Sequence, residues 1–130
     1  MKAREIYRRA LALLAEQDDG AGYDTEAFEN CAPALINLLC TMLDELDLFI
    51  KCRDFRDNQV EPRQIESLED EVPLHPVITS GVMPLGLAFL LIAEENATRA
   101  ALFFKLYQSE KDALFRRYRK ARRHKITSVY

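Results

Sequence analysis

The sequence has no tryptophan, and only four glycines and five prolines among 130 residues. It contains no G-x-x-x-x-G-K segment and no glycine-rich dinucleotide fingerprint, so neither kind of phosphate-binding loop is expected. The two histidines, His75 and His124, lie outside any recognisable serine or cysteine nucleophile motif. We expect no catalytic residues, no cofactor and no small-molecule substrate. Only a deep polar pocket in the folded protein would support the hypothesis that this chain is an enzyme.

Metal-ligand and disulfide patterns are also lacking. No glutamate precedes a histidine by three residues, as the di-metal sites of helical bundles require. The acidic residues around Asp44 and Asp47 are interpreted as a solvated helix face, and no metal site is predicted. Cys31, Cys40 and Cys52 are odd in number and nine and twelve residues apart, which favours reduced and mostly buried thiols.

Long hydrophobic runs are absent. The longest, residues 82–93, contains Pro84 and Gly86 and is shorter than the ~18–20 residues that span a bilayer. The apolar run at residues 10–15 is too short for the core of a signal peptide. We therefore expect no membrane segment and a protein that stays on the cytosolic side.

Helical periodicity is the dominant positive signal. Apolar residues recur at three- and four-residue spacing in segments 2–16, 35–50 and 97–122. Segment 75–93 is apolar nearly all round and should be the central, most buried helix. The pattern predicts an all-α bundle of four to five helices in one domain, residues 1–125. A short extended tail, 126–130, is expected to follow a basic helix end.

The expected buried stripes can be assigned residue by residue. In the second and fourth segments they are Leu35, Leu38, Leu39, Met42, Leu43, Leu46, Phe49, Ile50, Phe103, Leu106, Tyr107, Leu114 and Tyr118. Asp24 and Thr98 are candidate helix caps. Pro33 should stand in a first turn or kink a longer helix, and Pro84 and Gly86 permit a kink or a close approach.

One long polar connection, residues 56–76, joins the second and third helices and contains Pro62, Pro73 and Pro76. Loops of this length inside a compact domain tend to be functional or to be ordered by a partner. We expect residues 66–76 to be ordered by a neighbouring molecule. Ser67, followed by acidic residues, could start a helical turn.

Charge is distributed unevenly. Residues 116–125 carry seven lysines and arginines and no acid, whereas the remainder of the chain has a net charge of −10. This uneven distribution of charge indicates that the basic end contacts a partner protein or another copy of the chain. Two alternatives stay open: a solvated helix end favoured by its own dipole, and a stripe that neutralises nucleic-acid phosphates around Tyr118.

The order of these segments resembles the small all-α head-to-tail adaptor (connector, or head-completion) proteins of tailed bacteriophages and prophages. The resemblance covers residues 2–125. It rests on the helices AREIYRRALALLAE, APALINLLCTMLDELD and VITSGVMPLGLAFLLIAEEN, and on the spacing of Ala97, Ala100, Phe103 and Tyr107. The closest match is the run Ser67–Leu74, followed by the helical segment Pro84–Ala88.

The resemblance implies a virion structural protein, or one in the host bacterial cytoplasm, that forms a homo-oligomeric ring on the portal or a neighbouring neck protein. DNA would pass through such a ring without specific recognition. The tail resembles the C-terminal arm with which these adaptors hold a neighbour. The expected partner-binding residues are Arg116, Arg117, Arg119, Arg122, Arg123, Ile126, Val129 and Tyr130. The alternative function is a nucleic-acid-associated helical module.

Overall fold

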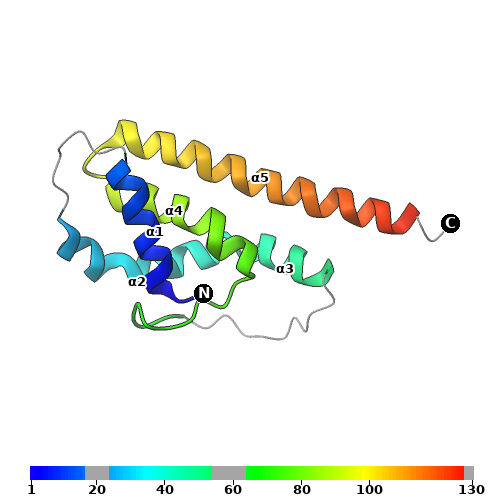
Figure 1. Cartoon of the computed structure of the whole chain (residues 1–130), viewed down its shortest axis with the longest axis horizontal. Helices are drawn as coiled ribbons and strands as arrows, with labels where there is room; N and C mark the ends of the chain where they lie inside the picture. The colour runs from blue at the N-terminus through cyan, green and yellow to red at the C-terminus, as the bar shows by residue number, and fades with distance from the viewer. Residues whose placement is uncertain (17–23, 54–63, 128–130) are drawn as a thin grey trace.

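A computed structural model describes residues 1–16, 24–53 and 64–127, and the side chains of the last segment as far as Arg119. These residues form an all-α bundle, which confirms the predicted fold class (Figure 1). The elements are α1 (Ala3–Glu16), α2 (Thr25–Met42), α3 (Asp44–Arg53), a π-helical turn η1 (Ile78–Val82), α4 (Met83–Ile92) and α5 (Ala97–Thr127).

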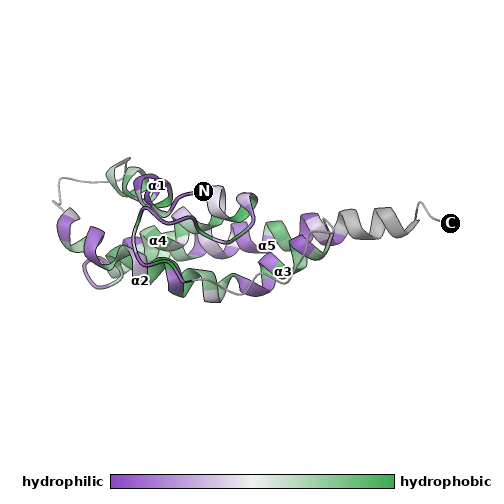
Figure 2. Cartoon of the chain, turned by 90° about the horizontal axis from the view of Figure 1, so that it is seen from below, coloured by the Kyte–Doolittle hydropathy of each residue, from purple (hydrophilic) through white to green (hydrophobic). Residues whose placement is uncertain are grey.

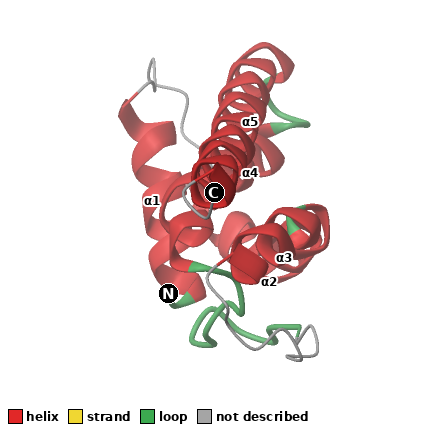
Figure 3. Ribbon diagram, turned by 90° about the vertical axis from the view of Figure 1, so that its right-hand side faces the viewer, coloured by secondary structure: helices red, strands yellow, loops and turns green. Residues whose placement is uncertain are grey.

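Helix α4 is the centre of the bundle. It packs against α1, α2 and α5, and seven of its ten residues are buried. The end-on view shows α1, α5 and the α2–α3 pair arranged around this centre (Figure 3). Because α4 has no polar face, every side of it must be covered by another element. The prediction of a central apolar helix is therefore confirmed.

Gly86 allows the closest approach in this core. A Cβ atom at this position would lie 2.6 Å from Leu39 Cδ2 on α2 and 3.1 Å from the Tyr107 ring on α5. Leu39 and Tyr107 are both fully buried, so neither side chain has free space to move into. The glycine thus lets three helices meet at one point.

We expect Gly86→Ala to destabilise the fold by about 1–2 kcal/mol, because overpacking at this contact outweighs the helix-propensity gain of about 1 kcal/mol. Gly81→Ala is the matched control, since a Cβ at Gly81 meets nothing within 4 Å. The control should be neutral or stabilising. Urea unfolding of both variants measures the difference, and equal stability of the two would contradict this account.

The predicted second helix is divided in two at Leu43. The Leu43 N–H donates to the Leu39 carbonyl at 2.9 Å and ends α2, and α3 begins at Asp44. The buried stripe continues through Leu43 and Leu46, so the periodicity gave no sign of the break. The expected cap is confirmed, because the Asp24 side chain accepts a hydrogen bond from the Ala27 N–H.

The structure settles one open detail and contradicts several expected ones. Of the two positions expected for Pro33, the structure shows the one inside a longer helix, α2, and not the one in a first turn. Asn96, not Thr98, caps α5, because its side chain accepts from the Arg99 N–H at 3.1 Å. Leu38, Met42 and Leu106 are exposed, and Tyr118 is half-buried. The cysteines were expected to be mostly buried, but Cys31 and Cys52 are exposed and Cys40 is half-buried.

Part of the polar connection, within residues 64–77, is held by backbone hydrogen bonds to its own chain. The Ala3 N–H donates to the Asp70 carbonyl at 3.0 Å, the Arg4 N–H to Leu68 at 2.8 Å, and the Val72 N–H to Met1 at 3.0 Å. The first two of these bonds satisfy the first two N–H groups of α1, which have no partner within the helix. Residues 54–63 lie outside the described part of the chain.

The C-terminal helix is longer than expected. Helix α5 continues to Thr127, so Ile126 is helical and does not begin an extended tail. A basic segment next to the negative end of a helix dipole favours this continuation. Val129 and Tyr130, which the sequence assigned to the tail, lie outside the described residues.

Candidate interaction surface

The C-terminal part of α5 extends beyond the body of the bundle (Figure 1), and the part before it runs alongside α3 (Figure 2). Its last buried side chain is Leu114, and the Phe115 ring meets the Phe49 ring of α3 at 5.6 Å between centroids. Beyond this contact Tyr118 is half-buried and packs against the core, whereas Arg116, Arg117 and Arg119 are exposed. The projecting end is therefore held at its base by an aromatic pair and is free to meet another molecule.

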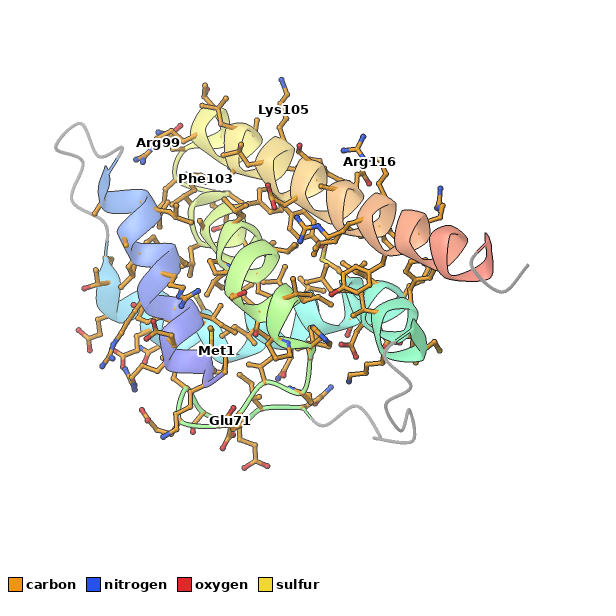
Figure 4. The ribbon with its side chains drawn as sticks, turned by 45° about the vertical axis from the view of Figure 1, so that its right-hand side comes forward. Met1, Glu71, Arg99, Phe103, Lys105 and Arg116 are labelled. Atoms are coloured by element: carbon orange, nitrogen blue, oxygen red, sulfur yellow. The ribbon has the colours of Figure 1, made fainter. Side chains whose placement is uncertain are left out.

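Exposed arginines flank Tyr118, the last described side chain of α5 that packs against the core. Arg116, Arg117 and Arg119 are exposed, and none of them joins an ion pair within the described residues. Figure 4 shows Arg116 pointing away from the bundle. Three predicted partner-binding residues are thus brought together on one exposed helix end, where no described carboxylate pairs with them.

The remaining predicted contact residues are placed less fully. Arg122, Arg123 and Ile126 belong to α5, but their side chains lie outside the described part. Val129 and Tyr130 fall in the undescribed residues 128–130. The described site therefore comprises Arg116, Arg117 and Arg119.

Acidic residues gather at the start of α1, away from the basic end of α5 (Figure 1). Arg4 pairs with Glu69 and, at 3.3 Å, with Glu29, while the terminal ammonium pairs with Glu71 at 3.1 Å. All three glutamates remain exposed. Exposed pairs of this kind contribute little to stability, but they attach the linker to the start of α1 and, through Arg4, to α2.

The carboxylate of Asp70 organises the turn that follows residue 65. It accepts hydrogen bonds from the Glu66 N–H at 2.8 Å and the Ser67 N–H at 3.1 Å. These bonds favour the charged carboxylate and hold the pKa of Asp70 below its ordinary value of 3.8. The predicted turn at Ser67 thus exists, with Asp70 as its acceptor.

The depressed pKa of Asp70 gives this turn a defined pH dependence. Its contribution to stability should be present above pH 3.8 and should be lost as pH falls through the lower, folded-state pKa. Amide chemical shifts of Glu66 and Ser67, followed by NMR during acid titration, should move together with a midpoint below 3.8. A midpoint at or above that value would contradict the assignment.

Asp47 was predicted to lie on a solvated acidic face, but it is only 4% exposed. Its carboxylate accepts from the His75 N–H at 2.8 Å and pairs with Lys51 Nζ at 2.7 Å. Lys51 also donates to the Pro73 carbonyl at 3.3 Å. The cluster fixes the end of the linker against α3, and its polar groups are occupied by structural bonds rather than directed into a cavity.

The Cys40 thiol offers little nucleophilic chemistry. Burial, reinforced by the charges of Asp47 and Asp44, raises the pKa of Cys40 to about 11. The thiolate is the reactive form, so Cys40 is inert at neutral pH. Within the described ranges, no three His, Cys, Asp or Glu side chains are placed to hold a metal ion.

A shallow cavity of about 400 Å³ lies between α1 and the start of α4. Its walls are mainly apolar, and its one charged lining residue is Arg9. Arg9 Nη1 donates to the Ser80 carbonyl at 2.9 Å, which ties α1 to the π-helical turn. The cavity lacks the convergent titratable groups of a catalytic pocket.

Apolar side chains on the outer side of α5 are the feature that the sequence interpretation missed. Leu102 is 53% exposed and Leu106 is 47% exposed. Leu106 had been assigned to the buried stripe, whereas Phe103, Tyr107 and Leu114 form that stripe. Positions 102 and 106 are four residues apart, a spacing that places both on one face of a helix.

No family model, curated protein or solved structure matches the chain. Across the parts of the chain that the structure describes, no helix combines the length and apolarity that crossing a membrane requires.

Proposed function

We propose that this chain is a structural adaptor of a tailed-phage or prophage neck, located in the virion or, before assembly, in the host bacterial cytoplasm. It assembles as a homo-oligomeric ring on the portal and has no catalytic role. The basic end of α5 contacts the portal or a neighbouring neck protein. DNA passes through the ring without specific recognition.

The observation that carries this proposal is the projecting α5, whose exposed Arg116, Arg117 and Arg119 have no ionic partner in the described chain. A ring needs two different faces on each subunit. The remainder of the chain, with its net charge of −10, supplies groups of opposite charge on other parts of the molecule. Such complementarity steers assembly and fixes its register.

The test is co-purification with a portal protein from a phage or prophage genome that encodes this chain. We expect the full chain to be retained. The triple variant Arg116→Glu/Arg117→Glu/Arg119→Glu should be lost from the complex. Lys105→Glu is the matched control, because Lys105 is an exposed base on α5 that lies within the body (Figure 4). Failure of the full chain to bind, or equal binding by the triple variant, would overturn the proposal.

A nucleic-acid-associated module is the second candidate, favoured by the same three exposed arginines beside the half-buried Tyr118. Arginine side chains that neutralise phosphates release counterions, so binding to generic DNA would weaken steeply with salt. Fluorescence anisotropy with a duplex of arbitrary sequence distinguishes the two candidates. Strong, salt-sensitive binding that the triple variant loses would support the module, whereas negligible binding would favour the adaptor.

A further inference from the structure

The outer side of α5 has the spacing of a helix-pairing seam. Leu102, Leu106, Ser109, Ala113 and Arg116 follow one another at intervals of four, three, four and three residues. This alternation places the five side chains along a single stripe of the kind that pairs in coiled coils. Both leucines are about half exposed, Ser109 and Arg116 are exposed, and Ala113 is half-buried.

The two ends of the seam carry side chains of opposite charge. Glu94 and Glu95 lie in the turn just before α5, and Arg116 and Arg117 lie toward its other end. All four side chains are exposed, and none takes part in an ion pair within the described residues. Leu106 stands halfway between Glu95 and Arg117 along the chain.

We propose that a second copy of this chain covers the seam, with the two α5 helices antiparallel and Leu106 at the two-fold axis. The acidic turn of each copy then faces the arginines of the other. Leu102 and Leu106 bury each other's exposed surface, while Ser109 and Ala113 are small enough to let the helices approach closely. A parallel arrangement would instead place the arginines of both copies together, which like-charge repulsion disfavours.

The pairing is a closed, isologous contact and differs from the ring contact. A seam of this length buries less than the roughly 1,200 Å² typical of stable interfaces, so the pair should be weak and reversible. It concerns the free protein and does not rest on the adaptor function. The basic end would be covered in the pair and would have to separate before it could contact a portal.

Sedimentation equilibrium of the purified chain across a wide concentration range tests the pairing. We expect a reversible monomer–dimer equilibrium. Leu106→Glu should weaken it at least about tenfold, because a carboxylate would be buried at the axis. Leu48→Glu is the matched control: Leu48 is 44% exposed on α3, outside the seam, and its variant should dimerise like the parent chain.

Charge exchange tests the antiparallel register. The variant Glu94→Lys/Glu95→Lys should weaken dimerisation, and the addition of Arg116→Glu/Arg117→Glu in the same chain should restore it. A chain that stays monomeric at every concentration would overturn the proposal. The proposal would also be overturned if Leu106→Glu and Leu48→Glu changed the dimerisation affinity equally. Failure of the four-residue charge exchange to restore the dimer would overturn it too. Portal binding is measured separately, so either proposal can fail alone.

Discussion

Replacing Phe103 by alanine is expected to reduce the free energy of unfolding by about 3–5 kcal/mol. Phe103 is 1% exposed and points from α5 toward α4 in Figure 4. Its removal leaves a cavity that the surrounding helices can close only in part. Small domains have a total stability of roughly 5–15 kcal/mol, so the variant should unfold at markedly lower urea concentration in circular-dichroism experiments.

The neighbouring residue provides the control for this measurement. Leu102 is 53% exposed, and Leu102→Ala should change stability by less than about 1 kcal/mol. It is measured at a protein concentration where the chain is monomeric. If both variants lost the same stability, the buried face of α5 would be assigned to the wrong residues.

Asp47→Ala should destabilise the chain by about 2–4 kcal/mol. The change leaves the His75 N–H without its acceptor and the partly buried Lys51 ammonium without its carboxylate. Both groups lie where the linker meets α3. Besides the loss in urea midpoint, amide hydrogen exchange should be faster over residues 73–78, which this cluster holds in place.

Asp44→Ala is the comparison, because Asp44 is an exposed acid in the first turn of the same helix. It should lose only the interaction with the helix dipole, about 0.3–1 kcal/mol. Exchange over residues 73–78 should be unchanged in this variant. If Asp44→Ala reduced the free energy of unfolding as much as Asp47→Ala does, the buried ion pair of Asp47 would contribute nothing beyond the helix-dipole interaction.

The architecture was predictable from the sequence because it follows from apolar periodicity. The segment around Leu87 has no polar side, so it had to be central, and the glycine at position 86 indicated a close approach. The break at Leu43 was not predictable. The stripe of buried residues continues through the break without a change in spacing. Hydrophobic spacing does not determine which carbonyl accepts a hydrogen bond from a given backbone N–H.

The attachment of the linker was missed for a related reason. Backbone bonds such as those from Ala3 to Asp70 and from Arg4 to Leu68 can form with almost any side chains. A polar, proline-containing segment therefore looks the same whether its own chain or a neighbour orders it. Asp47 was misplaced likewise, because a buried acid differs from a solvated one only through its partners.

The candidate site was only partly predictable. The run of bases identified the arginines, but composition alone did not show that α5 continues to Thr127, past its packing contacts at Phe115 and Tyr118. Leu106 was assigned to the core because it adjoins Tyr107 in an apolar pattern. Only one face of α5 can meet α4, and the two aromatic side chains Phe103 and Tyr107 occupy it.

The position of α4 also bears on how the chain matures at the ribosome. Helices α1 and α2 precede α4 in synthesis, whereas α5, which covers its remaining side, is made last. In a nascent chain, the apolar side of α4 that α5 covers therefore stays exposed until the segment around Tyr107 has emerged from the ribosome. During that interval a holdase chaperone can bind this exposed surface. Products truncated before α5 should be insoluble for the same reason.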